Sequence, residues 1–177
     1  MGRPTVSLVL AVVIGLAGGT LARADAPRLV AVMDLGHEHA TLPAGALETL
    51  EESIRSRTSD LLVPQGYGLL PKDKMMSVLY DNGIDAKRTC DSSCAIESGR
   101  ELKARYVVEG VVSSIDGQHV AFVRVLDTTT GEVMGTIKLR GATALELDKA
   151  LDARMGELFE KAGLQRPVRV EPKAAAK

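Results

Sequence analysis

Aromatic side chains are scarce in this chain, whose 177 residues include two Phe, three Tyr and no Trp. Sites for sugars and nucleobases commonly stack the ligand on such rings, and few rings are present to do so. An excess of one charge is lacking too, because 22 Lys and Arg residues face 23 Asp and Glu residues. Proteins that bind nucleic acid usually carry a basic surface. The composition therefore predicts no nucleic-acid partner.

Recognisable catalytic motifs are missing as well. No Gly-x-Ser-x-Gly elbow is present to expose a nucleophilic serine. Gly66 and Gly68 do not make a phosphate-binding loop, because a third glycine and the strand–loop–helix frame are absent. The sequence therefore predicts no catalytic residues, no resident metal and no cofactor, and a protein that is not an enzyme.

The amino terminus has the three regions of a secretory signal peptide in the usual order. Arg3 supplies the positive start, the uncharged stretch Pro4–Ala22 follows, and Ala22 and Ala24 occupy the −3 and −1 positions of a cleavage site. A permanent span needs about 20 strongly apolar residues, and glycines dilute the end of this stretch, although an uncleaved anchor is the alternative. The sequence predicts cleavage between Ala24 and Asp25 and a periplasmic or secreted protein.

The mature chain has the length of one small domain. Removal of the signal peptide, residues 1–24, takes away Arg3 and Arg23 but no acid, which leaves 20 basic and 23 acidic residues and a net charge of −3. Residues 25–164 are expected to form the domain around a single core. Residues 165–177 have no apolar periodicity and are predicted to be a disordered polar tail.

Hydrophobic periodicity predicts a mixed α/β domain, a single mixed sheet with helices packed on it. The expected order is strand, helix, strand, helix, helix, strand, strand, strand, helix. The expected strands are Leu29–Leu35, Tyr67–Leu70, Arg105–Ile115, His119–Leu126 and Val133–Arg140. The expected helices are Ala44–Leu62, Pro71–Leu79, Cys94–Ala104 and a last helix from a capping box at Thr143 and Glu146 to Gly163.

The last predicted strand alternates strictly between apolar and polar positions. This alternation is typical of a strand with one wet face at or near a sheet edge. The expected covered face holds Val133, Gly135, Ile137 and Leu139, and the expected wet face holds Met134, Thr136, Lys138 and Arg140.

Cys90 and Cys94 are the only cysteines. An even number at close spacing in an oxidising compartment favours a disulfide, which would pin the turn before the third helix. A metal site is the weaker alternative because two further ligands are not nearby. A redox-active pair would require Cys-x-x-Cys spacing, and here three residues separate the two cysteines.

Asp34, His37 and His39 form the one candidate constellation for metal chemistry. Asp34 ends a predicted strand, where α/β proteins often place site residues, and two histidines two positions apart can face one way on an extended segment. The simpler interpretation is a polar loop in which Asp34 supports the turn. Glu48, Glu51 and Glu52 are likewise interpreted as a solvated helix surface.

The order of the elements resembles the TolB amino-terminal and CsgG-like superfamily. The resemblance rests on the block Cys90–Gly110, in which a Gly and a Leu-x-Ala lead into an apolar strand ending in Gly, and on the hairpin segments Phe122–Asp127 and Thr130–Val133. The segments Val30–Leu35 and Gly66–Leu79 also fit, so that the resemblance covers roughly residues 29–163.

This resemblance implies an adaptor role in the bacterial cell envelope. Such domains dock on other envelope proteins, in secretion channels, cell-wall synthase activation and the Tol system. The expected partner is an unidentified envelope protein, and a homo-oligomer is possible. The chain departs from the family in having no lipid-attachment cysteine and no following propeller or pore-forming segment. A small metal-dependent enzyme or metal-binding protein using Asp34, His37 and His39 is the alternative hypothesis.

Overall fold

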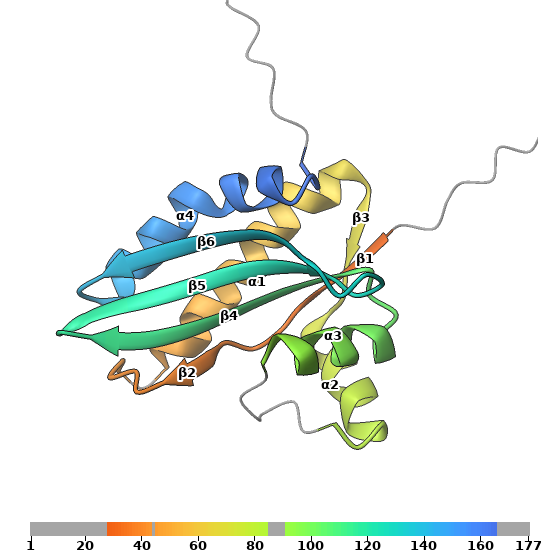
Figure 1. Cartoon of the computed structure of the whole chain (residues 1–177), viewed down its shortest axis with the longest axis horizontal. Helices are drawn as coiled ribbons and strands as arrows, with labels where there is room; N and C mark the ends of the chain where they lie inside the picture. The colour runs from red at the N-terminus through yellow and green to blue at the C-terminus, as the bar shows by residue number, and fades with distance from the viewer. Residues whose placement is uncertain (1–27, 44, 85–90, 166–177) are drawn as a thin grey trace, which may run out of the picture.

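The computed structural model describes residues 28–43, 45–84 and 91–165 of the chain. They contain four α-helices and a six-stranded mixed sheet, which confirms the predicted fold class (Figure 1). The elements in chain order are β1 Arg28–Val32, β2 Gly36–Glu38, α1 Ala46–Leu62, η1 Val63–Gln65, β3 Tyr67–Leu69, α2 Lys72–Asp81, α3 Ser92–Glu101, β4 Tyr106–Ile115, β5 Gln118–Asp127, β6 Val133–Gly141 and α4 Ala144–Lys161. The predicted signal peptide, Cys90 and residues 166–177 lie outside the described residues.

The sheet joins a parallel part to an antiparallel part. Its strands lie in the order β3-β1-β4-β5-β6, and β2 pairs with β4 beyond the end of β1. In the parallel part, β1 runs parallel to β3 and β4, and β2 runs parallel to β4. In the antiparallel part, β4, β5 and β6 form a long meander. The prediction that the last strand lies at an edge is confirmed, because β6 is terminal in the sheet.

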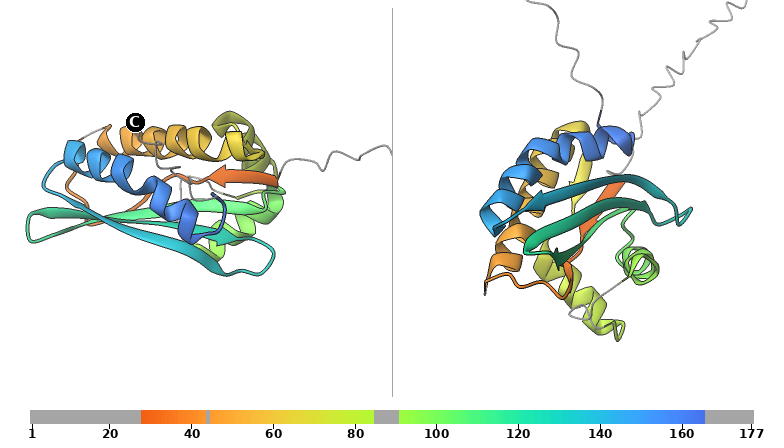
Figure 2. Two further views of the ribbon diagram at one scale, coloured as in Figure 1. Left: turned by 90° about the horizontal axis from the view of Figure 1, so that it is seen from above. Right: turned by 60° about the vertical axis from the view of Figure 1, so that its left-hand side comes forward.

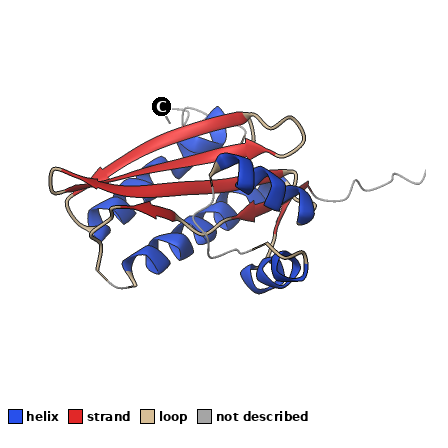
Figure 3. Cartoon of the chain, turned by 60° about the horizontal axis from the view of Figure 1, so that its bottom comes forward, coloured by secondary structure: helices blue, strands red, loops and turns tan. Residues whose placement is uncertain are grey.

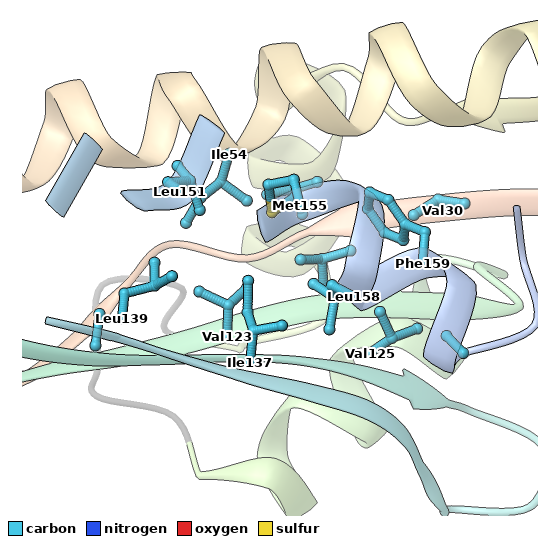
Figure 4. Packing of buried hydrophobic residues seen from close by; sticks show 14 of the residues in the cluster. Val30, Ile54, Val123, Val125, Ile137, Leu139, Leu151, Met155, Leu158 and Phe159 are labelled. Atoms are coloured by element: carbon cyan, nitrogen blue, oxygen red, sulfur yellow. The ribbon is translucent and has the colours of Figure 1, made fainter. Parts of the chain in front are cut away.

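One face of the sheet is covered along its length by α1 and α4 (Figure 2). The apolar stripe of α4 includes Leu151, Met155 and Phe159, all at most 1% exposed. These side chains meet Val123 and Ile137 of β5 and β6 in the main core (Figure 4). Burial of this continuous apolar surface is the chief source of stability for such a layered domain.

The opposite face is covered only at one end, by α2 and α3. A second, smaller core lies there. Its strand residues are Ala31 of β1, Val107 near the start of β4 and Leu126 near the end of β5. Its members are Ala31, Met33, Leu70, Met75, Leu79, Ala95, Leu102, Ala104, Val107 and Leu126. Figure 3 shows helices in front of the long strands only at one end.

Two local features differ from the sequence predictions. Gly36–Glu38, expected as a polar loop, forms the short strand β2 because it pairs with β4 in register with Val111–Ser113. Val133, expected on the covered face, is 52% exposed. Val125 pairs with Gly135 but Leu126 pairs with Val133, so Met134 is an extra residue in β6. Such a bulge places Val133 on the opposite face of the sheet from Gly135.

The helix ends follow the expected capping chemistry. The Thr143 hydroxyl accepts a hydrogen bond from the Glu146 amide at 3.2 Å, as the predicted capping box requires. The Glu146 carboxylate accepts from the Ala142 amide at 2.7 Å, one residue before the position in the standard motif. Gly163 follows α4 with a positive φ of 67°. Across the described residues, no helix is both long and apolar enough to cross a membrane.

Candidate docking site

The antiparallel part has one face that the helices leave largely uncovered, although Glu109 and Val120 on it are at most 8% exposed. We call it the open sheet face and define it by three cross-strand rows. The first row is Glu109, Arg124 and Thr136, the second Val111, Phe122 and Lys138, and the third Ser113, Val120 and Arg140. Because side chains alternate along a strand, these residues point away from the core face that holds Val123 and Ile137.

The first row contains a satisfied charge pair beside the amino terminus of α3. Arg124 Nη1 lies 3.2 Å from Glu109 Oε1 and also donates to the Ser92 hydroxyl at 3.0 Å. The Ser92 hydroxyl donates to the same Glu109 oxygen at 2.7 Å. Glu109 is only 8% exposed, so Arg124 supplies the counter-charge that burial of this carboxylate requires. This end of the open sheet face is electrically balanced.

The second and third rows carry uncompensated positive charge towards β6. Lys138 Nζ lies over the Phe122 ring, 5.3 Å from its centroid, which is a cation–π contact. Neither Lys138 nor Arg140 forms an ion pair with any residue that the structure describes, and both are exposed. In the third row the acid Glu38 lies three strands away from Arg140, on β2 beside Ser113. The β6 side of the open sheet face is therefore basic.

One backbone group on the outer edge of β6 is hydrogen-bonded by an arginine from α4. The Arg154 guanidinium donates to the Lys138 carbonyl, which must therefore point away from β5. In an antiparallel strand the outward backbone groups alternate with the paired ones, so Thr136 and Arg140 also direct their N–H and C=O groups outward. No other hydrogen bond between described residues reaches these outward groups.

A carboxylate on α4 holds this arginine in place. Glu157 accepts two hydrogen bonds from Arg154, at 2.8 and 2.9 Å, and its Oε1 lies 2.7 Å from Lys161 Nζ. The bonds from Arg154 and then Lys161 lower the pKa of Glu157 to about 2, and the bonds to Glu157 raise the pKa of Arg154. The arginine is thus fixed by a bidentate pair on its own helix.

Asp34 lies in a separate cluster at the carboxyl ends of β1 and β3. Lys72 Nζ, at the start of α2, lies 2.9 Å from Asp34 Oδ1 and 3.2 Å from Glu51 Oε2. Glu51 Oε1 also accepts from the Leu35 amide at 2.9 Å. The prediction that Glu51 is simply solvated is therefore wrong, because the chain bends back onto it after β1. The cluster ties α1, α2 and β1 together.

Arg55 completes this cluster by satisfying backbone carbonyls. Its guanidinium donates to the Val32 carbonyl at 2.8 Å and to the Leu70 carbonyl at 3.3 Å. Burial lowers the pKa of Arg55, and the nearby carboxylates, Asp34 first, oppose that shift. A hollow of about 590 Å³ opens beside it, lined by polar and charged residues of α1 and by Lys72. The charged groups of this cluster are bonded to one another and to the backbone, and they connect α1, α2 and β1.

The structure does not bring the three candidate metal ligands together. Asp34 is held by Lys72, and the His37 and His39 side chains are exposed. Among the described residues no group of three or more His, Cys, Asp and Glu side chains is placed to hold a metal ion. The remaining histidine, His119, is buried, and its Nδ1 lies 2.8 Å from the Ser114 hydroxyl.

The predicted disulfide falls partly outside the described residues, because Cys90 is not among them. Cys94 lies in the first turn of α3, where its amide donates to the Asp91 carboxylate at 2.9 Å. Asp91 thereby caps the helix. The Cys90–Cys94 disulfide stays a prediction.

Comparisons with known proteins establish the fold. No family model matches the chain, and no curated protein matches its sequence. The structure is similar to the LpoB C-terminal domain from Salmonella enterica, with a TM-score of 0.52 and 18% identity over 66% of this chain and 83% of that one. For the LpoB C-terminal domain from Escherichia coli the TM-score is 0.53 and the identity 16%, over 64% of this chain and 82% of that one. At such identities the likeness shows a shared fold alone.

A weaker likeness connects the chain to TolB. TolB from Acinetobacter baumannii matches with a TM-score of 0.46 and 11% identity, over 78% of this chain and 28% of that one. This similarity supports no argument about the chain. Membership of the TolB amino-terminal and CsgG-like superfamily therefore stays a prediction.

Of the wet face predicted for β6, Thr136, Lys138 and Arg140 are exposed, whereas Met134 is partly buried against the main core. The sequence patterns do not single out two residues that shape the candidate site. The sequence pattern predicts a strand for Phe122 but no face; in the structure Ala121 and Val123 on either side of it are buried, so Phe122 points away from the core. Arg154 was not singled out, since its bond to Lys138 joins elements 16 residues apart through tertiary packing. No local sequence pattern predicts such a contact.

Proposed function

We propose that this chain is an exported, non-enzymatic adaptor of the bacterial cell envelope that docks on another envelope protein through the open sheet face. The observation that carries the proposal is the open sheet face of β4, β5 and β6, where Phe122 lies beside Lys138 and Arg140, two cations without an ion-pair partner among the described residues. The proposal is consistent with the fold that the chain shares with the LpoB C-terminal domains from Salmonella enterica and Escherichia coli. The signal-like amino terminus is consistent with the same compartment.

The chemistry of the open sheet face suits a protein partner. Interfaces are enriched in aromatic residues and arginine at their centres and are surrounded by polar residues. Phe122 supplies a half-buried ring at the middle of the meander, and Arg124, Thr136 and Arg140 surround it. Unpaired basic groups also accelerate and orient encounter with an acidic surface.

Site-specific crosslinking in cells tests the docking surface. A photoreactive amino acid replacing Lys138 should give a discrete adduct with one envelope protein. The matched control places the same group at Lys149, which is exposed on α4 away from the open sheet face. The Phe122→Ala variant should weaken the Lys138 adduct. No adduct from Lys138, or equal adducts from both positions, would contradict docking through this face.

Export is tested separately from docking. The mass of the protein purified from the periplasmic fraction should correspond to a chain that begins at Asp25. An Ala24→Leu variant should accumulate as precursor, because the −1 position accepts only small residues. A full-length protein in the cytosol would contradict export and leave the docking surface to be judged by its own test.

The disulfide provides a further check on the compartment. Native, unreduced protein should show no thiol that iodoacetamide can alkylate, since Cys90 and Cys94 are the only cysteines. Two alkylated thiols would contradict the predicted disulfide.

A further inference from the structure

We infer, on the basis of the proposed adaptor function, that the β6 edge accepts an extended acidic segment of the partner protein as an additional strand, and that Arg154 acts as a latch on this edge. The latch must release the Lys138 carbonyl before the added strand can pair along the whole of β6. The inference specifies both the chemistry of the partner and the way in which it binds.

The backbone of β6 presents what strand addition requires. The outward N–H and C=O groups of Thr136, Lys138 and Arg140 are three successive sets at the free edge, spaced as a partner strand needs. Unpaired edges of this kind are templates for another chain. Among the described residues only Arg154 occupies one of these groups.

The side chains along β6 indicate an acidic partner. Thr136, Lys138 and Arg140 all lie on the open sheet face, so an added strand would place every second side chain beside them. Carboxylates at those positions would meet two cations that have no ion-pair partner in the described chain. Cross-strand pairs of opposite charge stabilise a sheet, and pairs of like charge destabilise it.

The same charges disfavour a second copy of this chain as the occupant. Two β6 strands related by a twofold axis through Lys138 would pair antiparallel, with Lys138 facing Lys138 and Arg140 facing Thr136. This arrangement would gather four cations on one small surface without an acid between them. Lysine on an edge strand is a common protection against self-association, and here it leaves an acidic strand as the complementary partner.

The latch can open without leaving a charge unpaired. When Arg154 leaves the Lys138 carbonyl, its two hydrogen bonds to Glu157 can remain, because they lie within α4. Opening therefore removes one hydrogen bond, and pairing with the added strand replaces it. Arg154 accordingly limits access to the edge while its own ion pair stays intact.

The test uses the mature chain and a synthetic peptide with nine alternating glutamate and valine residues and blocked ends. The peptide should bind, and its binding should slow hydrogen exchange at the Thr136, Lys138 and Arg140 amides, measured by NMR. A peptide with lysine in place of glutamate should not bind. Affinity should fall as salt rises, because the pairs are exposed to solvent.

Four variants separate backbone pairing from charge. Thr136→Pro removes an outward N–H that β5 does not use and should weaken peptide binding about tenfold. The double change Lys138→Met and Arg140→Met should weaken it comparably at low salt. Arg154→Ala should strengthen it a few-fold, while Lys161→Ala, which removes the other partner of Glu157, should leave it unchanged.

Four results would overturn the inference. Binding that is indifferent to Thr136→Pro would exclude strand addition, and dimerisation of the mature chain that protects the same amides would make a second copy the occupant. Tighter binding to phosphatidylglycerol vesicles than to the peptide would make a membrane the target. If the peptide fails but the crosslink from position 138 persists, the adaptor function stands and the edge inference alone is wrong.

Discussion

The parallel and antiparallel parts of the sheet differ in how many of their faces are covered by helices. In the parallel part, β1 is covered by α1 on one face and by α2 and α3 on the other, and Val30, Ala31 and Val32 are all at most 1% exposed. In the antiparallel part, β6 and most of β5 are covered by helices on one face only, and buried and exposed residues alternate along β6. Crossover connections bring helices to parallel strands, whereas hairpins bring none.

The difference extends to the charged groups. In the parallel part, Lys72 is shared by Asp34 and Glu51 at the strand ends, and Arg55 satisfies backbone carbonyls. In the antiparallel part, Lys138 and Arg140 point into solvent with no ion-pair partner among the described residues. Charges that join elements serve stability, and charges left free on an uncovered face remain available for a partner. The comparison therefore separates the part that holds the fold from the part proposed to bind.

The only two phenylalanines of the chain lie on opposite sides of the antiparallel part, and replacing them is expected to give the largest difference in stability. Phe159 is fully buried between α4 and the sheet, and Phe122 is half-buried on the open sheet face. Phe159→Ala should lower the free energy of unfolding by about 3–5 kcal/mol because it leaves a cavity. Phe122→Ala should lower it by about 1 kcal/mol. Urea denaturation followed by circular dichroism measures both.

The outcome decides whether the open sheet face is a binding surface or part of the core. A Phe122→Ala cost equal to that of Phe159→Ala would mean that this face is structurally buried. A small stability cost together with loss of the crosslink from position 138 would assign Phe122 to binding.

The features that sequence predicted best are those that depend on local periodicity. The element order, the wet face of β6 and the capping of α4 by Thr143 follow from alternation, helical spacing and short-range hydrogen bonding. The strand β2 was missed because its three residues have no strand pattern of their own. They become a strand only through pairing with β4, 70 or more residues later.

The features that sequence could not predict depend on which elements meet. Asp34 lies two residues beyond the end of β1, near the strand end that the sequence predicts, but its partner Lys72 lies on α2. The three candidate metal ligands were grouped because they are close in sequence. In the fold, the bend after β1 turns Asp34 to Lys72 and leaves both histidines in solvent.

Gly135 tests how closely α4 covers β6. A Cβ added there would lie 2.8 Å from the Leu158 carbonyl oxygen and 3.1 Å from the Ala162 amide nitrogen, both backbone atoms of α4. Gly135→Ala should therefore destabilise the protein by about 1–3 kcal/mol through overpacking. Thr136→Ala, one position along on the open sheet face, should change stability by at most about 0.5 kcal/mol. Equal thermal shifts for the two variants would mean that the faces are not packed differently.

Lys72 and Lys138 test the difference between a lysine that forms ion pairs between elements and a lysine without an ion-pair partner among the described residues. Lys72→Met should destabilise the protein by about 1 kcal/mol at neutral pH, since it removes two partly exposed ion pairs. Lys138→Met should change stability by less than about 0.5 kcal/mol. Chemical denaturation with both variants in parallel measures the contrast, and a larger cost at Lys138 would reverse the assignment.

The pH dependence of Lys72 has a definite sign. Burial alone would lower the pKa of Lys72, but hydrogen bonds and attraction from Asp34 and Glu51 outweigh it and raise the pKa above its ordinary value. The folded state therefore holds this proton more tightly than the unfolded state. Its contribution is fully present below the unfolded pKa and is lost as pH rises through the folded pKa, so the cost of Lys72→Met should vanish at strongly alkaline pH.

The smallest expected effect concerns the Glu157 carboxylate that holds the latch. Hydrogen bonds from Arg154 and Lys161 lower its pKa from 4.5 to about 2. The pairing is therefore complete above the unfolded pKa and is lost as pH falls through the folded value. Carbon-detected NMR titration of the side-chain carboxyl should show the low pKa in the wild type and a pKa nearer its ordinary value in Arg154→Ala. Lys161→Ala should shift it less, because Arg154 contributes the larger share. A pKa unchanged by Arg154→Ala would mean that the arginine is not held by Glu157 in solution, and the β6 edge would then be unguarded.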